Sequence, residues 1–348
     1  MSASLQSDSE SIVFQEYLGR VAAGDNLTLD ETHSAIDLIM RGDVADAQIA
    51  LFLTALHEKG ESVHEIAGAA AALRQHMTHI RSRRKGLIDT CGTGGDNSCT
   101  FNISTAAALV TAAAGLPVAK HGNRSITSRT GSADVLSALG VNIQADATCV
   151  EECLDTLGIC FCFAPLLHPA MKRVGEVRKQ LTHATIFNLL GPLANPAGAP
   201  YQLLGVGKPQ LRGRLAEALA LLGTERAVLV TGDDGLDEVT LATTTRVTVV
   251  EGGQLSELVW SPADFGLATS RLDSLLVDGP QKSAVMIEQV LNGQQGPAFD
   301  IVVINAAAAL WTARKADSPM QCAELAQSAI ESGAARELLA RLVEGTNR

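Results

Sequence analysis

Aromatic residues are scarce in this chain of 348 residues, because Phe, Trp and Tyr together make up only 3% of it. The core must therefore be built mainly from Ala, Leu, Val and Ile. Charged residues make up 19% and apolar residues 46%, a balance that is typical of a folded globular protein and excludes a disordered one. Since the chain is about twice the length of a typical single domain, we expect two domains.

Positive charge is also in short supply. The 27 Lys and Arg residues are outnumbered by 38 Asp and Glu residues, which gives a formal net charge of −11. An acidic surface repels DNA, RNA and anionic lipid, so we expect no nucleic-acid partner. No apolar run reaches the ~18 residues of a membrane span, and the polar residues 1–10 do not form a signal peptide. We therefore expect a cytoplasmic protein without a membrane partner.

The seven cysteines are odd in number and irregularly spaced. Cys149, Cys153, Cys160 and Cys162, with His168 nearby, invite a zinc interpretation. Their spacing, however, lacks the paired Cys-x2-Cys pattern of structural zinc sites. Small buried apolar side chains in a reducing compartment are the favoured interpretation, and zinc is the minor alternative.

The first 85 residues are predicted to be helical. Thr28–Glu31 and Ser62–Glu65 have the sequence of capping boxes, and Asp43 is a candidate cap for the helix between them. The basic run Arg81–Lys85 is expected to be a solvated linker, because short charge runs usually mark exposed loops.

From residue 86 onwards, short apolar strands alternate with Ala-rich helices, which predicts a parallel sheet with crossover helices. A two-residue turn at Gly252-Gly253 predicts a β-hairpin. Strands are expected at 86–90, 117–119, 141–143, 160–163, 202–206, 227–231, 245–251 and 254–260, with helices at 104–114, 132–139, 171–181 and from 318 onwards.

The expected fold class is α/β, with an N-terminal helical domain and a larger α/β domain that has a mostly parallel central sheet. The segment 172–200 interrupts the α/β order and is expected to pack back on the N-terminal helices. The predicted division is therefore 1–85, rejoined by 172–200, against 86–171 and 201–348.

Two polar clusters lie near the beginning of the predicted sheet. Asp89–Asp96 contains a glycine-rich turn between a strand and a helix, where backbone N–H groups can cradle phosphate. It is neither a Rossmann fingerprint nor a Walker loop, and a purely structural turn fits it equally well. Thr100–Thr105 has the hydroxyl and amide groups of an ordinary helix cap, which is the favoured interpretation, although pyrophosphate or hydrated Mg²⁺ needs the same groups.

Two further clusters follow predicted strands at their carboxyl ends, where open α/β sheets bind ligands. Lys120–Ser128 concentrates Lys, His and Arg in an acidic chain, which favours an anion site. Asp233–Thr240 contains Asp237 and Glu238, hard oxygen ligands suited to Mg²⁺ beside phosphates, although an acidic surface turn explains this cluster alone. The four clusters together fit a Mg²⁺-bound phosphorylated sugar that carries pyrophosphate.

At this point the chain resembles the anthranilate phosphoribosyltransferase family of tryptophan biosynthesis, from about Leu27 to Glu344. The resemblance is carried by six motifs in the family's order: Cys-Gly-Thr-Gly-Gly-Asp at 91–96, Asn-Ile-Ser-Thr at 102–105, Lys-His-Gly-Asn-Arg at 120–124, Gly-Ser-Ala-Asp at 131–134, Ile-Phe-Asn-Leu-Leu-Gly-Pro-Leu-Ala-Asn-Pro at 186–196 and Asp-Gly-Leu-Asp-Glu-Val at 234–239. It implies a fold of the nucleoside phosphorylase and phosphoribosyltransferase type, and a homodimer formed through the N-terminal helices.

The resemblance also implies roles for individual residues. Phosphoribosyl pyrophosphate would be bound by Gly92, Gly95, Asp96, Thr100, Asn102, Ile103, Ser104, Thr105, Lys120, His121, Gly122, Asn123, Arg124, Ser125, Ile126, Thr127, Ser128 and Ser132. Anthranilate would be bound by Gly92, Asn123 and Arg178, and Mg²⁺, expected as two ions, by Ser104, Asp237 and Glu238. His121 is a candidate polar partner of the acceptor, and no catalytic nucleophile is implied. Without the resemblance, Arg178 is best interpreted as a helix-surface arginine.

The acceptor region departs from the family's usual pattern. Gly175–Arg178 lacks the usual proline before Val-Arg, and Thr182–Thr185 replaces a usual Gly-x-Arg-Thr. Glu176 is an added acid, and Ala184 stands in place of an arginine. We expect these changes to alter the contacts with the acceptor.

Two alternative functions follow from the same sequence. A pyrimidine nucleoside phosphorylase would share the architecture, but residues 90–93 and 120–124 differ from its phosphate loop. A noncatalytic nucleic-acid-binding relative would need a basic surface and would lose the carboxylates Asp237 and Glu238.

Overall fold

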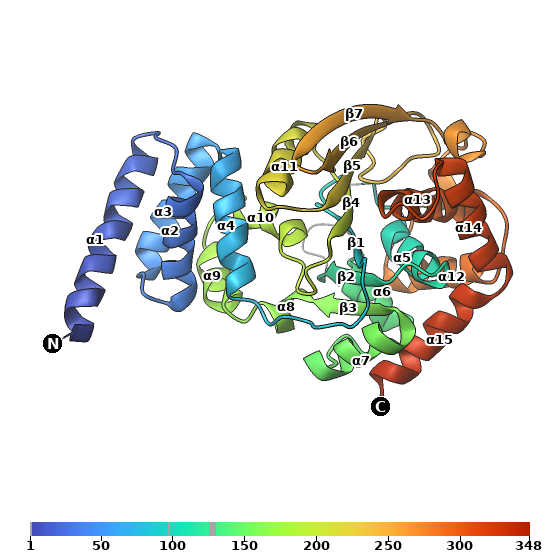
Figure 1. Ribbon diagram of the computed structural model, residues 1–348, viewed down its shortest axis with the longest axis horizontal. Coiled ribbons are helices and arrows are strands. Elements are labelled where there is room, and N and C mark those ends of the chain that lie inside the picture. Colours follow the sequence, from blue (N-terminus) through green and yellow to red (C-terminus); the bar gives the residue numbers. More distant parts are fainter. Residues whose placement is uncertain (1, 97, 125–129) are drawn as a thin grey trace.

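The computed structural model describes residues 2–96, 98–124 and 130–348. A helical bundle forms one end of the molecule and a larger α/β part forms the other (Figure 1). The bundle contains α1 (Ser2–Ala22), α2 (Leu29–Arg41), α3 (Asp46–Lys59) and α4 (Val63–Gln75). The expected fold class is therefore confirmed.

The predicted capping boxes of the bundle are present. The side chains of Thr28 and Ser62 each accept a hydrogen bond from the backbone of the third helical residue, which is a glutamate that returns the contact. The prediction that Asp43 caps α3 is wrong, because Ala45 occupies the cap position. The Asp43 carboxylate instead accepts a hydrogen bond from Arg41 at 2.6 Å.

A seven-stranded sheet crosses the α/β part in the order β3-β2-β1-β4-β5-β6-β7. The first five strands of this order are parallel, and β6 and β7 continue the sheet antiparallel. The strands are β1 (Ile88–Gly92), β2 (Val118–Gly122), β3 (Ile159–Phe163), β4 (Tyr201–Gly205), β5 (Arg226–Gly232), β6 (Thr245–Glu251) and β7 (Gln254–Trp260).

The predicted hairpin has the bounds of β6 and β7, but other strand predictions need correction. Residues 141–143 form no strand. β1 and β2 run on to Gly92 and Gly122, so Lys120 and His121 lie within a strand rather than after it. Because successive side chains of a strand point to opposite faces, these two neighbours point to different sides of the sheet.

The remaining helices cover both faces of the sheet. They are α5 (Ile103–Ala113), α6 (Ser132–Ala138), α7 (Ala147–Leu157), α8 (Ala164–Leu167), α9 (Met171–Arg178), α10 (Phe187–Leu190), α11 (Pro209–Leu221), α12 (Pro280–Leu291), α13 (Pro297–Thr312), α14 (Pro319–Glu331) and α15 (Ala334–Thr346), with the 3-10 turns η1 (Gly191–Leu193), η2 (Pro262–Phe265) and η3 (Asp273–Leu275). Within the described residues, no helix has the length and apolar character needed to cross a membrane.

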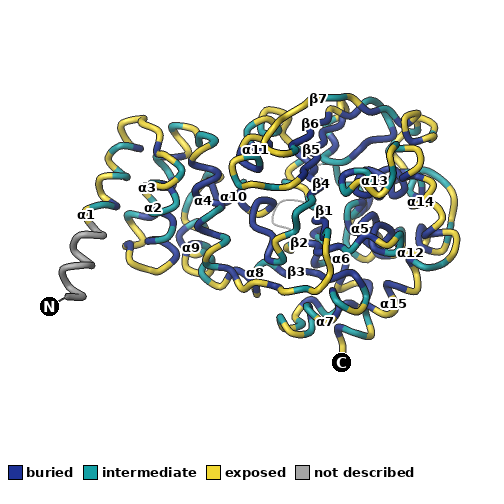
Figure 2. Tube along the Cα trace, in the orientation of Figure 1, coloured by how far each residue is buried: buried dark blue, intermediate teal, exposed yellow. Residues whose placement is uncertain are grey.

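Neighbouring residues of β4 and β5 belong to two different apolar cores, so the cores lie on opposite faces of these strands. Figure 2 shows that the strands of the sheet are largely buried. One core joins α5 and α13 to residues such as Ile88 and Val228. The other joins the helical bundle to α11 and to Leu204 and Leu229, and it includes Val174 of α9. The bundle and the sheet thus share one apolar core, which fixes the position of the segment between them.

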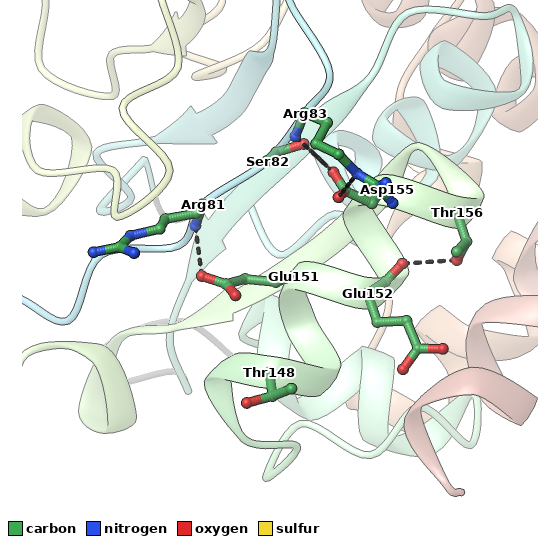
Figure 3. Close-up of a pocket in the computed structure, with 8 residues that line it drawn as sticks. All are labelled: Arg81, Ser82, Arg83, Thr148, Glu151, Glu152, Asp155 and Thr156. Atoms are coloured by element: carbon green, nitrogen blue, oxygen red, sulfur yellow. Dashed lines mark hydrogen bonds and ion pairs between the residues drawn. The ribbon is translucent and has the colours of Figure 1, made fainter.

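The basic run Arg81–Lys85 is exposed but not simply solvated. Arg83 pairs with Asp155 at 2.9 Å, and Arg84 donates to the backbone oxygens of Asp155 and Thr156 in the last turn of α7. Cationic side chains at a helix C-terminus satisfy its free carbonyl groups and its dipole. This linker therefore caps α7, and the two segments line a surface pocket of about 420 Å³ (Figure 3).

Candidate active site

Glycines end the central strands because the acidic loop after β5 lies directly against them. A Cβ atom on Gly205, at the end of β4, would overlap the backbone oxygen of Asp237. A Cβ atom on Gly92, at the end of β1, would lie 2.7 Å from the Asp237 Oδ2 atom. The Gly94 N–H donates to that same oxygen at 3.2 Å. The tertiary structure therefore brings the first and fourth sequence clusters into contact.

Three carboxylates gather at this point. Burial, followed by the negative charge of Asp96, raises the pKa of Asp237 to about 7. Burial, followed by the charge of Asp237, raises the pKa of Glu238 well above its usual value. Because like charges oppose each other's ionisation, a cation placed here would favour the ionised carboxylates. The chemistry of these carboxylates therefore suits a divalent cation that also has ligands from outside the protein.

Lys120 reaches the same place from β2. Only 3% of the residue is exposed, and its Nζ donates to the Thr90 carbonyl oxygen and, at 3.2 Å, to Ser104 Oγ. Burial lowers the pKa of Lys120, while nearby acidic groups, Asp89 foremost and then Cys91, Glu238 and Asp237, oppose that shift. The Lys120 side chain, a candidate partner for an anionic ligand, is thus held between the β1 backbone and the beginning of α5.

The beginning of α5 does not have the ordinary cap that the sequence favoured. Asn102 occupies the cap position, but its side chain makes no capping hydrogen bond. Its Oδ1 accepts from Ser283 Oγ at 3.0 Å, and its Nδ2 donates to the Thr130 carbonyl at 3.4 Å. The backbone N–H of Ser104 instead donates a hydrogen bond to the Glu238 carboxylate. This bond partly offsets the rise in the pKa of Glu238. Ser283, on α12, carries no motif that could have revealed this contact.

His121 faces the other side of β2. Its Nδ1 lies 3.0 Å from the Gly191 carbonyl oxygen and its Nε2 lies 3.2 Å from His168 Nε2. Since a carbonyl only accepts, Nδ1 carries the proton and Nε2 accepts from His168. Burial, then the charge of His168, lowers the pKa of His121 to about 3, and burial lowers the pKa of His168 to about 4. Both rings are neutral at pH 7, which argues against general acid–base catalysis by His121.

Arg178 ends α9, which stops there rather than at residue 181. Its guanidinium donates to Asn188 Oδ1 at 3.0 Å and lies 5.8 Å from the centre of the Phe187 ring. Burial lowers the pKa of Arg178. Arg178 thus lies partly buried at the end of a surface helix, and its guanidinium makes specific contacts with Asn188 and Phe187. Within the described residues, no contact joins it to the carboxylates around Asp237.

The loop after β2 closes on the start of α6. Arg124 pairs with Asp134 at 2.8 Å, and the Asn123 carbonyl accepts from Ser132 Oγ at 3.4 Å. A Cβ atom on Gly122 would overlap Ser132 Oγ, which explains the glycine. The candidate residues Ser125, Ile126, Thr127 and Ser128 lie outside the described residues.

The remaining candidate residues lie in the segment before α5 or in its first turn. Thr100 Oγ1 lies 3.1 Å from Ser98 Oγ, and Ile103 is buried in the core. Thr105 Oγ1 is buried and has no hydrogen-bond partner among the residues that the structure describes. Gly95 has a φ of +81°, a conformation that favours glycine.

Metal binding by protein side chains alone is not supported. In the ranges that the structure describes, no three His, Cys, Asp or Glu side chains are arranged to hold a metal ion. The zinc alternative therefore gains no support, and Cys160 and Cys162 are buried thiols 3.9 Å apart. Mg²⁺, in contrast, is commonly held by one or two carboxylates together with substrate phosphates and water.

The chain is similar to enzymes of one family over nearly its full length. Residues 15–77 match the glycosyl transferase family helical bundle domain, and residues 84–336 match the glycosyl transferase family a/b domain. An anthranilate phosphoribosyltransferase from Moorella thermoacetica is 47% identical over 94% of this chain and 96% of its own. One from Laribacter hongkongensis is 47% identical over 97% of this chain and 99% of its own.

Solved structures agree. Anthranilate phosphoribosyltransferase from Thermus thermophilus superposes with a TM-score of 0.89 at 40% identity, covering 95% of this chain and 99% of its own. The Saccharomyces cerevisiae enzyme in complex with PRPP and Mg has a TM-score of 0.86 at 28% identity, covering 96% of this chain and 98% of its own. This chain therefore belongs to the anthranilate phosphoribosyltransferase family and is a phosphoribosyltransferase enzyme.

Proposed function

We propose that the protein transfers the phosphoribosyl group of phosphoribosyl pyrophosphate to the amine of anthranilate. The products are N-(5-phosphoribosyl)anthranilate and pyrophosphate, the second step of tryptophan biosynthesis from chorismate. The observation that carries the proposal is the convergence of Lys120, Ser104, Asp237 and Glu238 at the glycine-ended strands β1 and β4. The relatives whose structures contain PRPP with Mg, or 4-fluoroanthranilate, support the choice of substrates.

Lys120, the backbone around Gly94 and Gly95 and the beginning of α5 would bind the phosphates, together with the other residues that the resemblance implied. A buried ammonium and aligned backbone N–H groups stabilise anions strongly because little water competes with them. Ser104, Asp237 and Glu238 would hold Mg²⁺, proposed as two ions. When bound, Mg²⁺ supplies positive charge that stabilises the departing pyrophosphate.

Arg178 would bind the carboxylate of anthranilate, since its planar fork matches a carboxylate and Asn188 occupies only one of its nitrogens. Gly92 and Asn123 would complete the acceptor site. The aromatic amine is neutral at pH 7, so its attack on the ribose carbon needs no strong base. This agrees with the low pKa of His121. The chain's main contributions are orientation and stabilisation of charge on an oxocarbenium-like ribose.

We also propose that residues 172–200 belong with the helical part, which the position of Val174 and Val177 in its core supports. A homodimer through the N-terminal helices is proposed as well, and the exposed Ile12 and Leu51 of α1 and α3 support it. The cytoplasm is the expected location.

The test is direct. Purified protein is mixed with anthranilate, phosphoribosyl pyrophosphate and Mg²⁺, and the loss of anthranilate fluorescence is followed. We expect loss that depends on Mg²⁺ and on both substrates. No Mg²⁺-dependent loss would overturn the proposal. So would faster phosphorolysis of thymidine or uridine, or salt-sensitive DNA binding without turnover.

A further inference from the structure

The segment between α9 and α10 is fastened at its tip to helix α3 of the bundle. The His183 ring stacks on the His57 ring, with centroids 4.5 Å apart and planes inclined by 11°. His183 Nε2 lies 3.2 Å from Thr54 Oγ1, and its Nδ1 lies 2.9 Å from the Ala184 carbonyl oxygen. Because that carbonyl only accepts, Nδ1 donates to it, and Nε2 shares a second hydrogen bond with the Thr54 hydroxyl. His183 therefore makes two separate contacts with one face of α3.

The base of the same segment holds the arginine proposed to bind the acceptor. Asn188 Oδ1 accepts from the Arg178 guanidinium at 3.0 Å and from the Thr185 N–H at 2.9 Å. The Leu181 N–H donates to the Arg178 carbonyl at 3.1 Å. Residues 178–188 thus form a closed loop, with Arg178 at the base and His183 at the tip.

Packing holds both sides of the loop, because Leu181 packs against the core of the bundle and Ile186 and Phe187 are buried in it. Lys179, Gln180, Thr182 and Ala184 are exposed. Ala184, next to the tip, has no polar side-chain group that could make a further contact. Helix α9 itself packs against α3, and both lie at the bundle end of the molecule (Figure 1). Among the described residues, the tip of the loop is joined to helix α3 by the hydrogen bond of the His183 ring with Thr54 and by its stacking on His57.

We propose that His183 is a positioning residue for acceptor binding. Its contacts with Thr54 and His57 hold the loop against α3, and this restricts Arg178 to the orientation that Asn188 defines. The energetic basis is preorganisation, because a guanidinium already held in place loses less conformational freedom when it captures a carboxylate. The inference rests on the proposed function, since Arg178 is assigned to the acceptor there.

Steady-state kinetics of His183→Ala provide the first test. We expect the KM for anthranilate to rise about 5- to 10-fold, with kcat and the KM for phosphoribosyl pyrophosphate changed less than about twofold. His57→Ala should shift the same parameter by a smaller factor, because the Thr54 contact remains. His64→Ala is the matched control, since His64 is an exposed bundle histidine without a described side-chain contact. An unchanged KM for anthranilate in His183→Ala, or equal rises for both substrates, would overturn the proposal.

A double-mutant cycle separates positioning from a general structural role. In an Arg178→Ala background, His183→Ala should change the KM for anthranilate less than about twofold, because its effect passes through Arg178. If the double variant instead raised the KM for anthranilate by the product of the two single-variant factors, the two residues would act independently and the proposal would be contradicted. His183→Phe retains a ring that can stack on His57, so it should recover part of the loss seen in His183→Ala.

Hydrogen exchange tests the docking without using activity. The amides of 179–185 should exchange faster in His183→Ala than in the wild-type protein or in His64→Ala, whereas those of α4 should not. Unchanged exchange would refute the docking, and faster exchange with an unchanged KM would refute the positioning. A wild-type protein that fails to consume anthranilate would instead refute the proposed function, while the exchange result would still report on the loop.

Discussion

The backbone oxygen of Asp237 occupies the space that a Cβ atom on Gly205 would need. Asp237 belongs to the loop after β5 and Gly205 ends β4, so the contact joins two neighbouring strands at their carboxyl ends. The carboxylate of the same Asp237 meets the end of β1 at Gly92 and Gly94. The position of the acidic loop, and with it the geometry of the proposed metal site, therefore depends on residues without side chains.

Gly205→Ala should displace the acidic loop. We expect a loss of activity of about 100-fold or more and a destabilisation of about 1–3 kcal/mol, because the added methyl group overlaps the Asp237 backbone, which must shift. Activity assays and denaturant unfolding measure the two effects. Gly213→Ala is the control, since a Cβ there meets nothing within 4 Å and alanine favours the interior of α11. Equal behaviour of the two variants would contradict the close approach.

Replacement of both proposed metal ligands, Asp237→Asn with Glu238→Gln, should abolish Mg²⁺-dependent turnover. Without Mg²⁺, this double variant should remain folded. Its free energy of unfolding should fall less than that of the wild type as pH rises from about 4 to about 7. In the wild type, the raised pKa of Asp237 means that the folded state binds more protons than the unfolded state in this range, so its stability falls there. Thermal unfolding across pH, with and without Mg²⁺, measures this. Undiminished turnover would reject both residues as ligands.

His121 and His168 should make the protein sensitive to acid. Their pKa values, about 3 and about 4, lie below the usual value near 6.5, so the folded state favours the neutral rings. The resulting stability is present above about pH 6.5 and is lost progressively as pH falls towards 3. The His168→Asn variant should show a shallower fall in the free energy of unfolding over this range. A pH dependence identical to that of the wild type would contradict the pairing.

Catalysis should not follow the titration of these rings. We expect kcat to be flat between about pH 6 and 9, and His121→Asn to retain kcat within about 10-fold, because a neutral ring bonded to the Gly191 carbonyl positions the chain rather than transfers protons. A kinetic pKa near 6.5 that disappears in His121→Asn would show instead that His121 transfers a proton.

Arg178→Ala should raise the KM for anthranilate more than the KM for phosphoribosyl pyrophosphate, by about 10- to 100-fold against less than about threefold. Asn188→Leu should act in the same direction but less strongly, because it leaves the guanidinium present and unsupported. Gln180→Ala, an exposed change in the same loop, serves as the control. The opposite order of KM effects would reject Arg178 as the acceptor contact.

Local sequence determined the elements whose signals are self-contained. The capping boxes at Thr28 and Ser62, and the Gly252-Gly253 hairpin, each place every interacting group within a few residues, so neighbouring side chains suffice to specify them. The alternation of short strands and helices similarly predicted the parallel sheet. The six ordered motifs by themselves indicate the family.

Tertiary structure decided the partners of the candidate site residues. Asn102 bonds Ser283, and His121 bonds His168, across separations that no periodicity spans. It also extended β1 and β2 into polar residues, because hydrogen bonds with neighbouring strands hold those residues in the sheet. The sequence by itself thus determined the chemistry that the strand ends carry. Only folding determined which groups meet, because burial and close approach, not residue type, set the pKa values and orientations there.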